Sequence, residues 1–107
     1  QFFLGTDEMV IPEIKLTRGL DGRTGQAIFK FDKPVALSSD NFKEIQGMYL
    51  IDEEGQITTR NVNIRVANGE NTAIEAIYSW KTESDFSRFM RFANRYAKYN
   101  GLSYQEK

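Results

Sequence analysis

The chain has 107 residues, of which 40% are hydrophobic, 27% charged and 13% aromatic. This length and balance indicate one globular domain over residues 1–107, because disordered chains are poorer in aromatic residues and carry a larger net charge. Neither cysteine nor histidine occurs, which excludes disulfides, thiolate zinc sites, cysteine nucleophiles and histidine-based acid–base chemistry. The longest apolar runs fall far short of the roughly 20 residues that a membrane-spanning helix needs.

Charge is unevenly distributed along the chain, although the net charge is −1. Residues 1–81 contain 9 basic and 12 acidic side chains, a net charge of −3, and residues 82–107 contain 5 basic and 3 acidic side chains, a net charge of +2. With a pI near 5.5, the domain lacks the basic balance of nucleic-acid-binding proteins. We therefore expect no nucleic-acid partner, whereas the basic C-terminal segment is compatible with a local acidic partner.

The first predicted elements are strands. A short apolar stretch occupies residues 1–4, and residues 10–18 alternate between two faces with a period of two. Pro12 has no backbone donor, so it places the second of these strands at its start, at a bulge or at a sheet edge. A glycine-rich loop at 19–25 separates this strand from another at 26–32, and the two are predicted to form a hairpin. The apolar face of the later strand consists of Ala27, Phe29 and Phe31.

The middle of the chain predicts a connector and further strands. Residues 33–44 form the connector, in which short helical turns are expected. Strands flank the polar tetrad 52–55, which ends in Gly55, the residue type that adopts positive φ at the lowest cost. Asn-Gly at 68–69 is the strongest hairpin signal in the chain, and it leads into an alternating strand at 71–80. These strands are expected to form an antiparallel meander.

One amphipathic helix is predicted over residues 83–99. Thr82 caps its start, and Asn-Gly at 100–101 supplies its end. At about 100° per residue, one apolar stripe faces the sheet. The stripe consists of Phe86, Phe89, Met90, Ala93, Tyr96 and Ala97. The predicted fold is α+β, an antiparallel sheet meander with one C-terminal helix packed on one face.

The opposite helix face supplies the candidate partner-binding residues. Four cations lie there, namely Arg88, Arg91, Arg95 and Lys98, and two aromatic residues, Phe92 and Tyr99, lie between the two faces. Arginine and aromatic residues are enriched in interface hot spots, so this face favours docking to an acidic protein segment or an anionic membrane surface. The simpler interpretation is a solvated helix face, with the aromatic pair tucked under Leu102 and Tyr104. Arg60 and Arg65 on the preceding strands complete the candidate set.

No constellation of residues predicts catalysis or a metal site. The carboxylates at 52–54 are interpreted as a plain turn, because adjacent residues in a turn point apart and no EF-hand pattern follows. The glycines at 19–25 do not match a phosphate-binding loop. Phe29 and Phe31 are expected in the core rather than on a base-stacking surface. We therefore expect no enzyme, no cofactor and no metal, while any open sheet edge is able to accept an extended peptide.

Several sequence strings are distinctive when taken together in order. They are VIPEIKLTR at 10–18, the glycines of the following loop, AIFKF at 27–31, GMYLIDEEG at 47–55, NG at 68–69, and RFMRF at 88–92 followed by RY and NGL. In order and register, these strings resemble the photosystem II assembly protein family Psb28. Phe86, Ser87, Ala93 and Asn94 depart from the usual helix sequence of that family. We interpret the chain as a divergent or second copy within it.

The resemblance implies a non-catalytic auxiliary protein without bound pigment. It implies transient, peripheral binding to photosystem II core intermediates on the cytoplasmic or stromal side of the thylakoid membrane. The expected partners are the chlorophyll-binding inner antenna protein and reaction-centre subunits near the quinone side, and the chain is expected to be a monomer. On this hypothesis, changing Arg88, Arg91 and Arg95 to glutamate abolishes binding and leaves the thermal midpoint nearly unchanged. The alternative is a regulatory domain that binds a small ligand or lipid headgroup between helix and sheet.

Overall fold

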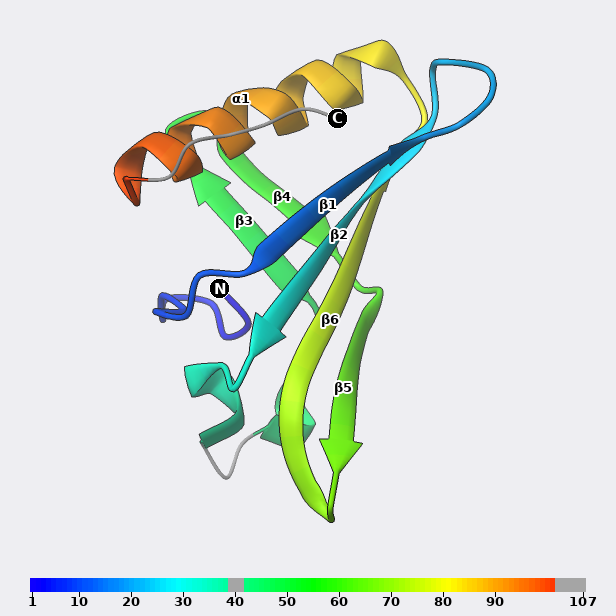
Figure 1. The fold of residues 1–107 in the computed structure, drawn as a ribbon. Helices are drawn as coiled ribbons and strands as arrows, with labels where there is room; N and C mark the ends of the chain where they lie inside the picture. Colours follow the sequence, from blue (N-terminus) through cyan, green and yellow to red (C-terminus); the bar gives the residue numbers. More distant parts are fainter. Residues whose placement is uncertain (39–41, 102–107) are drawn as a thin grey trace.

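The computed structural model describes residues 1–38 and 42–101, which form two antiparallel sheets and one α-helix (Figure 1). The larger sheet has the strand order β1-β2-β6-β5, and the smaller one pairs β3 with β4. The strands are β1 (Glu13–Arg18), β2 (Gly25–Asp32), β3 (Met48–Asp52), β4 (Gly55–Thr59), β5 (Val62–Ala67) and β6 (Glu70–Trp80). The α-helix is α1 (Glu83–Tyr99), and two 3-10 helices, η1 (Val35–Ser38) and η2 (Phe42–Glu44), follow β2. The α+β class with antiparallel strands and a C-terminal helix is confirmed, as are the short helical turns of the connector.

β1 and β2 form the predicted hairpin. Glu13 lies opposite Lys30, and Arg18 lies opposite Gly25. β1 begins directly after Pro12 and is an outer strand of its sheet. The backbone N–H that proline lacks is therefore not needed for a hydrogen bond between strands. The predicted inner face of β2 is also confirmed, because Ala27, Phe29 and Phe31 are all buried.

β5 and β6 form a second hairpin, closed by the predicted Asn-Gly turn. Asn68 and Gly69 have φ values of 54° and 79°. Positive φ at both central residues is what a type I′ turn requires, and its twist matches that of the two strands. β6 is longer than either of its neighbours; it pairs with β5 within residues 70–76 and with β2 over residues 73–80, so its middle is paired on both sides.

The strand order differs from the simple meander that the sequence predicts. β2 is followed in the sheet by β6 rather than by β3, and β3 pairs only with β4. The connector with η1 and η2 carries the chain away from β2, so the open side of β2 is available to the long β6 (Figure 1). The β3–β4 hairpin instead forms a separate sheet, which lies as a second layer over the larger one.

The apolar stretch at 1–4 is not a strand. Phe3 takes part only in an isolated bridge, and Gly5, with a φ of 90°, turns the chain before a ladder forms. The segment is nevertheless fixed to β3, because the backbone N–H of Tyr49 donates to the carbonyl oxygen of Gln1 at 2.7 Å. Phe2 is only 3% exposed, so this segment contributes to the core without joining a sheet.

α1 has the predicted bounds. The hydroxyl oxygen of Thr82 accepts a hydrogen bond from the backbone N–H of Asp85 at 3.0 Å, which satisfies one of the free donors of the first turn. Asn100 caps the C-terminal end, and Gly101 follows with a φ of 68°. No α-helix in the described ranges combines the length and apolarity needed to cross a bilayer.

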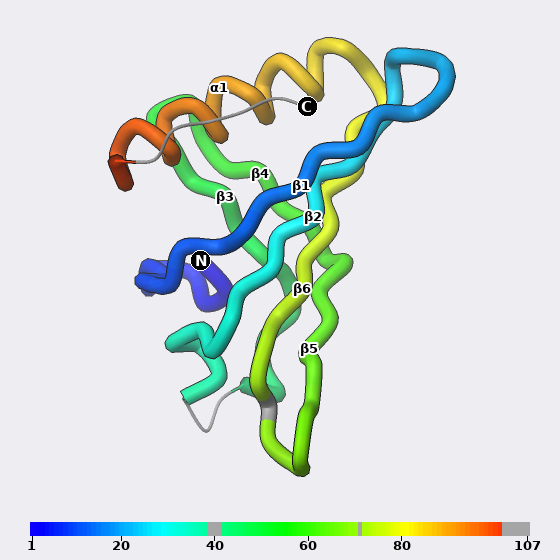
Figure 2. The backbone as a smooth tube through the Cα atoms, in the orientation of Figure 1, coloured from blue at the N-terminus to red at the C-terminus, as the bar shows by residue number. Residues whose placement is uncertain are grey.

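The core lies between the four-stranded sheet and a layer made by α1 and the β3–β4 hairpin (Figure 2). The hairpin contributes Met48, Leu50 and Ile57 to it. Phe89 of α1 is completely buried, and its ring centroid lies 5.3, 5.9 and 6.0 Å from those of Tyr78, Trp80 and Phe29. Because α1 contacts both β3 and β6, its orientation is set by two separate sheets.

Candidate functional site

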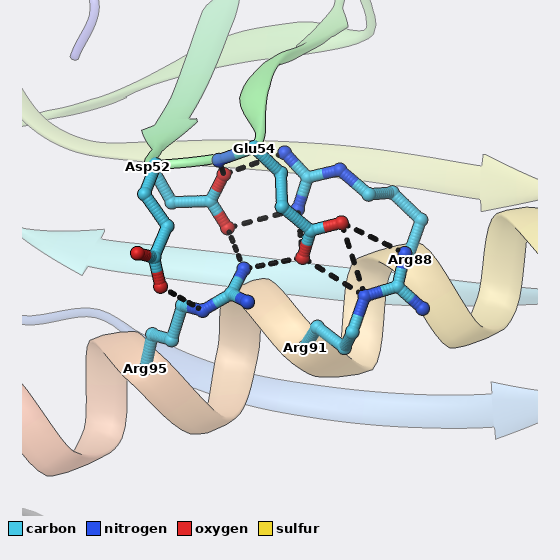
Figure 3. A network of polar contacts seen from close by, with 6 residues as sticks. Asp52, Glu54, Arg88, Arg91 and Arg95 are labelled. Atoms are coloured by element: carbon cyan, nitrogen blue, oxygen red, sulfur yellow. Dashed lines mark hydrogen bonds and ion pairs between the residues drawn. The ribbon is translucent and has the colours of Figure 1, made fainter.

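Three arginines of α1 lie on the side of the helix that faces the β3–β4 turn. Arg88, Arg91 and Arg95 are three and four positions apart, so they project from successive turns of one helix face. The turn supplies three consecutive carboxylates, those of residues 52–54, before β4 begins at Gly55. Figure 3 shows the arginine side chains meeting the carboxylates of Asp52 and Glu54. We call these six residues the arginine–carboxylate network.

The least exposed pair of the network joins Arg88 to Asp52. The two terminal nitrogens of Arg88 donate to the two carboxylate oxygens of Asp52 at 2.8 and 2.6 Å, a bidentate geometry that is among the stronger side-chain interactions. The side chains of Arg88 and Asp52 are 21% and 7% exposed. Asp52 also accepts hydrogen bonds from Arg95 at 2.9 Å and from the backbone N–H of Glu54 at 3.0 Å. It is therefore the anchor of the network.

The other end of the network is more exposed. Nε and Nη2 of Arg91 donate to the Glu54 carboxylate at 2.8 and 2.9 Å. Arg95 also donates to Glu54, and its Nε pairs with Glu53 at 3.0 Å. Arg91 and Arg95 are 50% and 37% exposed, and Glu53 is 76% exposed. Exposure thus increases from the Arg88–Asp52 pair to the pairs made by Glu53 and Glu54.

The arginines stabilise the ionised form of the turn carboxylates. Hydrogen bonds from Arg88 are the main reason why the pKa of Asp52 falls from 3.8 to about 2, although burial opposes the change. Hydrogen bonds from Arg91, followed by those from Arg95, lower the pKa of Glu54 from 4.5 to about 2. Both carboxylates are therefore charged throughout the neutral pH range, and the network holds three positive and three negative charges.

The network differs from the simpler interpretation of the sequence, in which the arginines form a solvated helix face. The sequence also suggested that the side chains of the acidic turn point apart, whereas Asp52 and Glu54 both engage arginines. The physical reason is that the β3–β4 hairpin lies beside α1 instead of forming part of a meander. Changing the three arginines to glutamate would gather six carboxylates at one place, so we now expect a lower thermal midpoint for that variant rather than an unchanged one.

The two flanking aromatic residues have different environments. Tyr99 is 91% exposed, as predicted, but Phe92 is only 7% exposed and belongs to the core. The ring of Phe92 stacks on that of Tyr96, with centroids 5.9 Å apart. α1 packs against the β3–β4 hairpin as well as against the larger sheet, so more of the helix surface is buried than the apolar stripe that faces the larger sheet. The expectation that both aromatic residues lie at the surface is therefore wrong for Phe92. Leu102 and Tyr104 lie outside the described residues.

The remaining candidate cations are not brought together. Lys98 is exposed in the last turn of α1. Arg60 is exposed between β4 and β5, and the connection between these two strands lies away from the C-terminal end of α1 (Figure 1). Arg65 of β5 is 63% exposed and pairs with Glu75 of the neighbouring strand at 3.1 Å. The candidate set thus divides into the arginine–carboxylate network, the C-terminal end of α1, and the β4–β5 region.

The space between α1 and the larger sheet is filled by aromatic side chains. Trp80 lies 5.0 Å from Phe86, centroid to centroid, and the guanidinium of Arg18 lies 4.1 Å from the Phe86 ring centroid. Two surface hollows, of about 490 and 370 Å³, lie at opposite ends of the sheet, and no residue of α1 lines either of them. In the described part of the chain, no cluster of three or more acidic side chains is arranged to hold a metal ion.

The fold and the site define a small α+β protein whose main polar feature is a charge-paired helix face. A family model described as Psb28 protein matches residues 1–104. The Photosystem II reaction center Psb28 protein of Prochlorococcus marinus (strain MIT 9211) is 64% identical, covering 100% of this chain and 92% of the relative. The protein of the same description from Synechococcus sp. (strain CC9605) is 55% identical, covering 99% of this chain and 84% of the relative. The chain belongs to the Psb28 family of photosystem II reaction center proteins.

Proposed function

We propose that this protein is a non-catalytic auxiliary factor that binds photosystem II core intermediates during their assembly. The observation that carries the proposal is the family match over residues 1–104, with relatives named for the photosystem II reaction center. The protein binds peripherally at the thylakoid membrane, on the cytoplasmic or stromal side. Its contacts lie near the chlorophyll-binding inner antenna and the quinone side of the reaction centre. The task is recognition, so no cofactor is required.

The proposed binding mode uses an outer strand together with exposed side chains. β1 and β5 are the outer strands of the larger sheet, and the free side of such a strand is able to pair with an extended tail of a core subunit. The candidate side chains best placed to assist are Arg60, Lys98 and Tyr99. All three are exposed, and their side chains form no hydrogen bond or ion pair within residues 1–38 and 42–101.

Native gels test the function directly. Tagged protein is added to detergent-solubilised thylakoids, and the chlorophyll-containing band that it joins is identified. We expect co-migration with a manganese-free core intermediate that contains the inner antenna. If the protein joins no chlorophyll-containing complex, the proposed function is wrong.

A pair of matched variants tests the side chains at the end of α1. The double change Lys98→Glu with Tyr99→Ser is expected to weaken co-migration, because both side chains are exposed and lie outside the core. The control is Lys43→Glu with Val35→Ser, which makes the same change of charge and also replaces an exposed hydrophobic side chain with serine, in η2 and η1. Equal co-migration of the two variants would remove this end of the helix from the proposed interface.

Hydrogen exchange tests the strand part of the proposal without any substitution. Amides along the free side of one outer strand, β1 or β5, are expected to become protected when the protein is bound in the intermediate. Protection of neither strand would rule out strand addition while leaving the native-gel result valid.

A further inference from the structure

We propose that Arg91 and Arg95 form an exchangeable site for an acidic protein segment, in which two consecutive carboxylates of a partner replace Glu53 and Glu54. The inference deepens the proposed function, because it names the chemistry that a partner presents to this helix face. It rests on that function only for the presence of a partner, since the exchange itself is a property of this chain.

The β3–β4 turn shows which ligand the arginines accept. Two adjacent residues of the turn, Glu53 and Glu54, are both held by Arg95, and Glu54 is also held by Arg91 through two nitrogens. The fork of an arginine matches a carboxylate in this bidentate way, which a lysine does not reproduce. A partner segment with two adjacent carboxylates would offer the same groups to the same two arginines.

The exposure gradient of the network indicates which pairs are exchangeable. The Arg88–Asp52 pair is shielded, with only 7% of the Asp52 side chain exposed. Glu53, by contrast, is 76% exposed, and Arg91 is 50% exposed. Exposed ion pairs contribute little to stability, because water and salt screen them. Glu54 is held more firmly than Glu53, because its side chain is only 29% exposed and it also lies 3.8 Å from Arg88. Glu54 therefore leaves Arg91 and Arg95 only when another carboxylate takes its place, while Arg88 and Asp52 continue to hold the hairpin against the helix.

Competition from the turn sets the affinity of the site. The turn is covalently attached, so it is present at a high effective concentration, and a free acidic peptide binds only the fraction of molecules in which the arginines are released. A segment that is already tethered to the protein elsewhere has the same advantage as the turn. The site therefore discriminates against free anions and favours an acidic segment delivered as part of a larger contact.

The test uses a double variant that removes the internal competitor. Glu53→Gln with Glu54→Gln is measured for binding to a short synthetic peptide of repeated Asp-Glu-Glu by fluorescence anisotropy at low salt. We expect the variant to bind the peptide about fivefold to tenfold more tightly than the natural chain does. Adding Arg91→Gln and Arg95→Gln to the variant is expected to abolish this gain. Thermal unfolding confirms that each variant is folded.

The matched control is Glu13→Gln with Glu70→Gln. It makes the same change in net charge on β1 and at the start of β6, at exposed carboxylates that form no side-chain hydrogen bond or ion pair within the described ranges. Equal gains in the two double variants would overturn the proposal, because a general charge effect would then explain the binding. Equal binding of a peptide of repeated Asn-Gln-Gln would also overturn it.

Binding to an anionic membrane surface, instead of a protein segment, would give a different result. Capture by vesicles that contain phosphatidylglycerol, without binding of the acidic peptide, would overturn the protein-segment proposal in favour of an anionic lipid surface. Because these measurements use the isolated chain, their failure leaves the native-gel test of the proposed function unaffected. Failure on the native gel, in turn, would not change the peptide result.

Discussion

Replacing Asp52 with asparagine is expected to lower the free energy of unfolding by about 1–2 kcal/mol. The side chain keeps its size but loses the charge that Arg88 and Arg95 share. The fall in the pKa of Asp52 from 3.8 to about 2 corresponds to roughly 2 kcal/mol in favour of the ionised form. Arg95 is 37% exposed, so solvent screening reduces the loss. In a domain of this size, we expect a thermal midpoint about 5–10 °C lower.

Circular dichroism followed through thermal unfolding measures this change. Glu70→Gln is the control, because it neutralises an exposed carboxylate that forms no side-chain hydrogen bond or ion pair among the described residues. That variant is expected to unfold at the same temperature as the natural chain. If Asp52→Asn also unfolds at that temperature, the network does not hold the hairpin to the helix, and the reasoning from burial and hydrogen bonding is refuted.

Two further predictions concern pH and packing. The folded-state pKa values of Asp52 and Glu54, about 2, lie below the ordinary values of 3.8 and 4.5, so their contribution to stability is complete above about pH 5 and is lost as the pH falls toward 2. The urea midpoint of unfolding should decline as the pH falls from about 5 toward 2. It should decline less in a variant with both Asp52→Asn and Glu54→Gln, because that variant lacks the two carboxylates. If the urea midpoints of the two proteins decline in parallel, these carboxylates are not the cause of the pH dependence. Gly25→Ala would place a Cβ 2.3 Å from Cζ2 of Trp80 and 2.6 Å from the carbonyl oxygen of Thr17, at a cost of about 1–3 kcal/mol. Because Trp80 is the only tryptophan, its fluorescence reports the unfolding, and an unchanged urea midpoint would contradict the close contact.

Local patterns were sufficient to predict most individual elements. The bounds of α1 follow from Thr82 and from the Asn-Gly pair at 100–101, because capping depends only on neighbouring residues. The β5–β6 turn follows from Asn68 and Gly69 for the same reason. The inner face of β2 follows from strict alternation along the strand.

The strand order and the arginine–carboxylate network were not predicted, because both depend on contacts between distant parts of the chain. Alternation shows which face of β6 is buried, but it does not show whether β3 or β6 pairs with β2. The network did leave a signal, since three consecutive acidic residues at 52–54 match in number the arginines at 88, 91 and 95. That signal becomes useful only when the turn is known to lie beside the helix. The same missing contact explains why the sequence pattern predicts Phe92 at the surface, whereas the structure buries it.

The pairing of β2 with β6 also affects the order of events during synthesis of the chain. Phe29 and Ala76 are cross-strand neighbours although they are 47 positions apart. At translation rates of about 5–20 residues per second, the exposed side of β2 waits several seconds for its partner strand to be made. During this interval the β1–β2 hairpin has a hydrophobic face without cover and one strand without a neighbour. This unfinished hairpin is therefore a nascent species that is prone to pair wrongly or to need a chaperone.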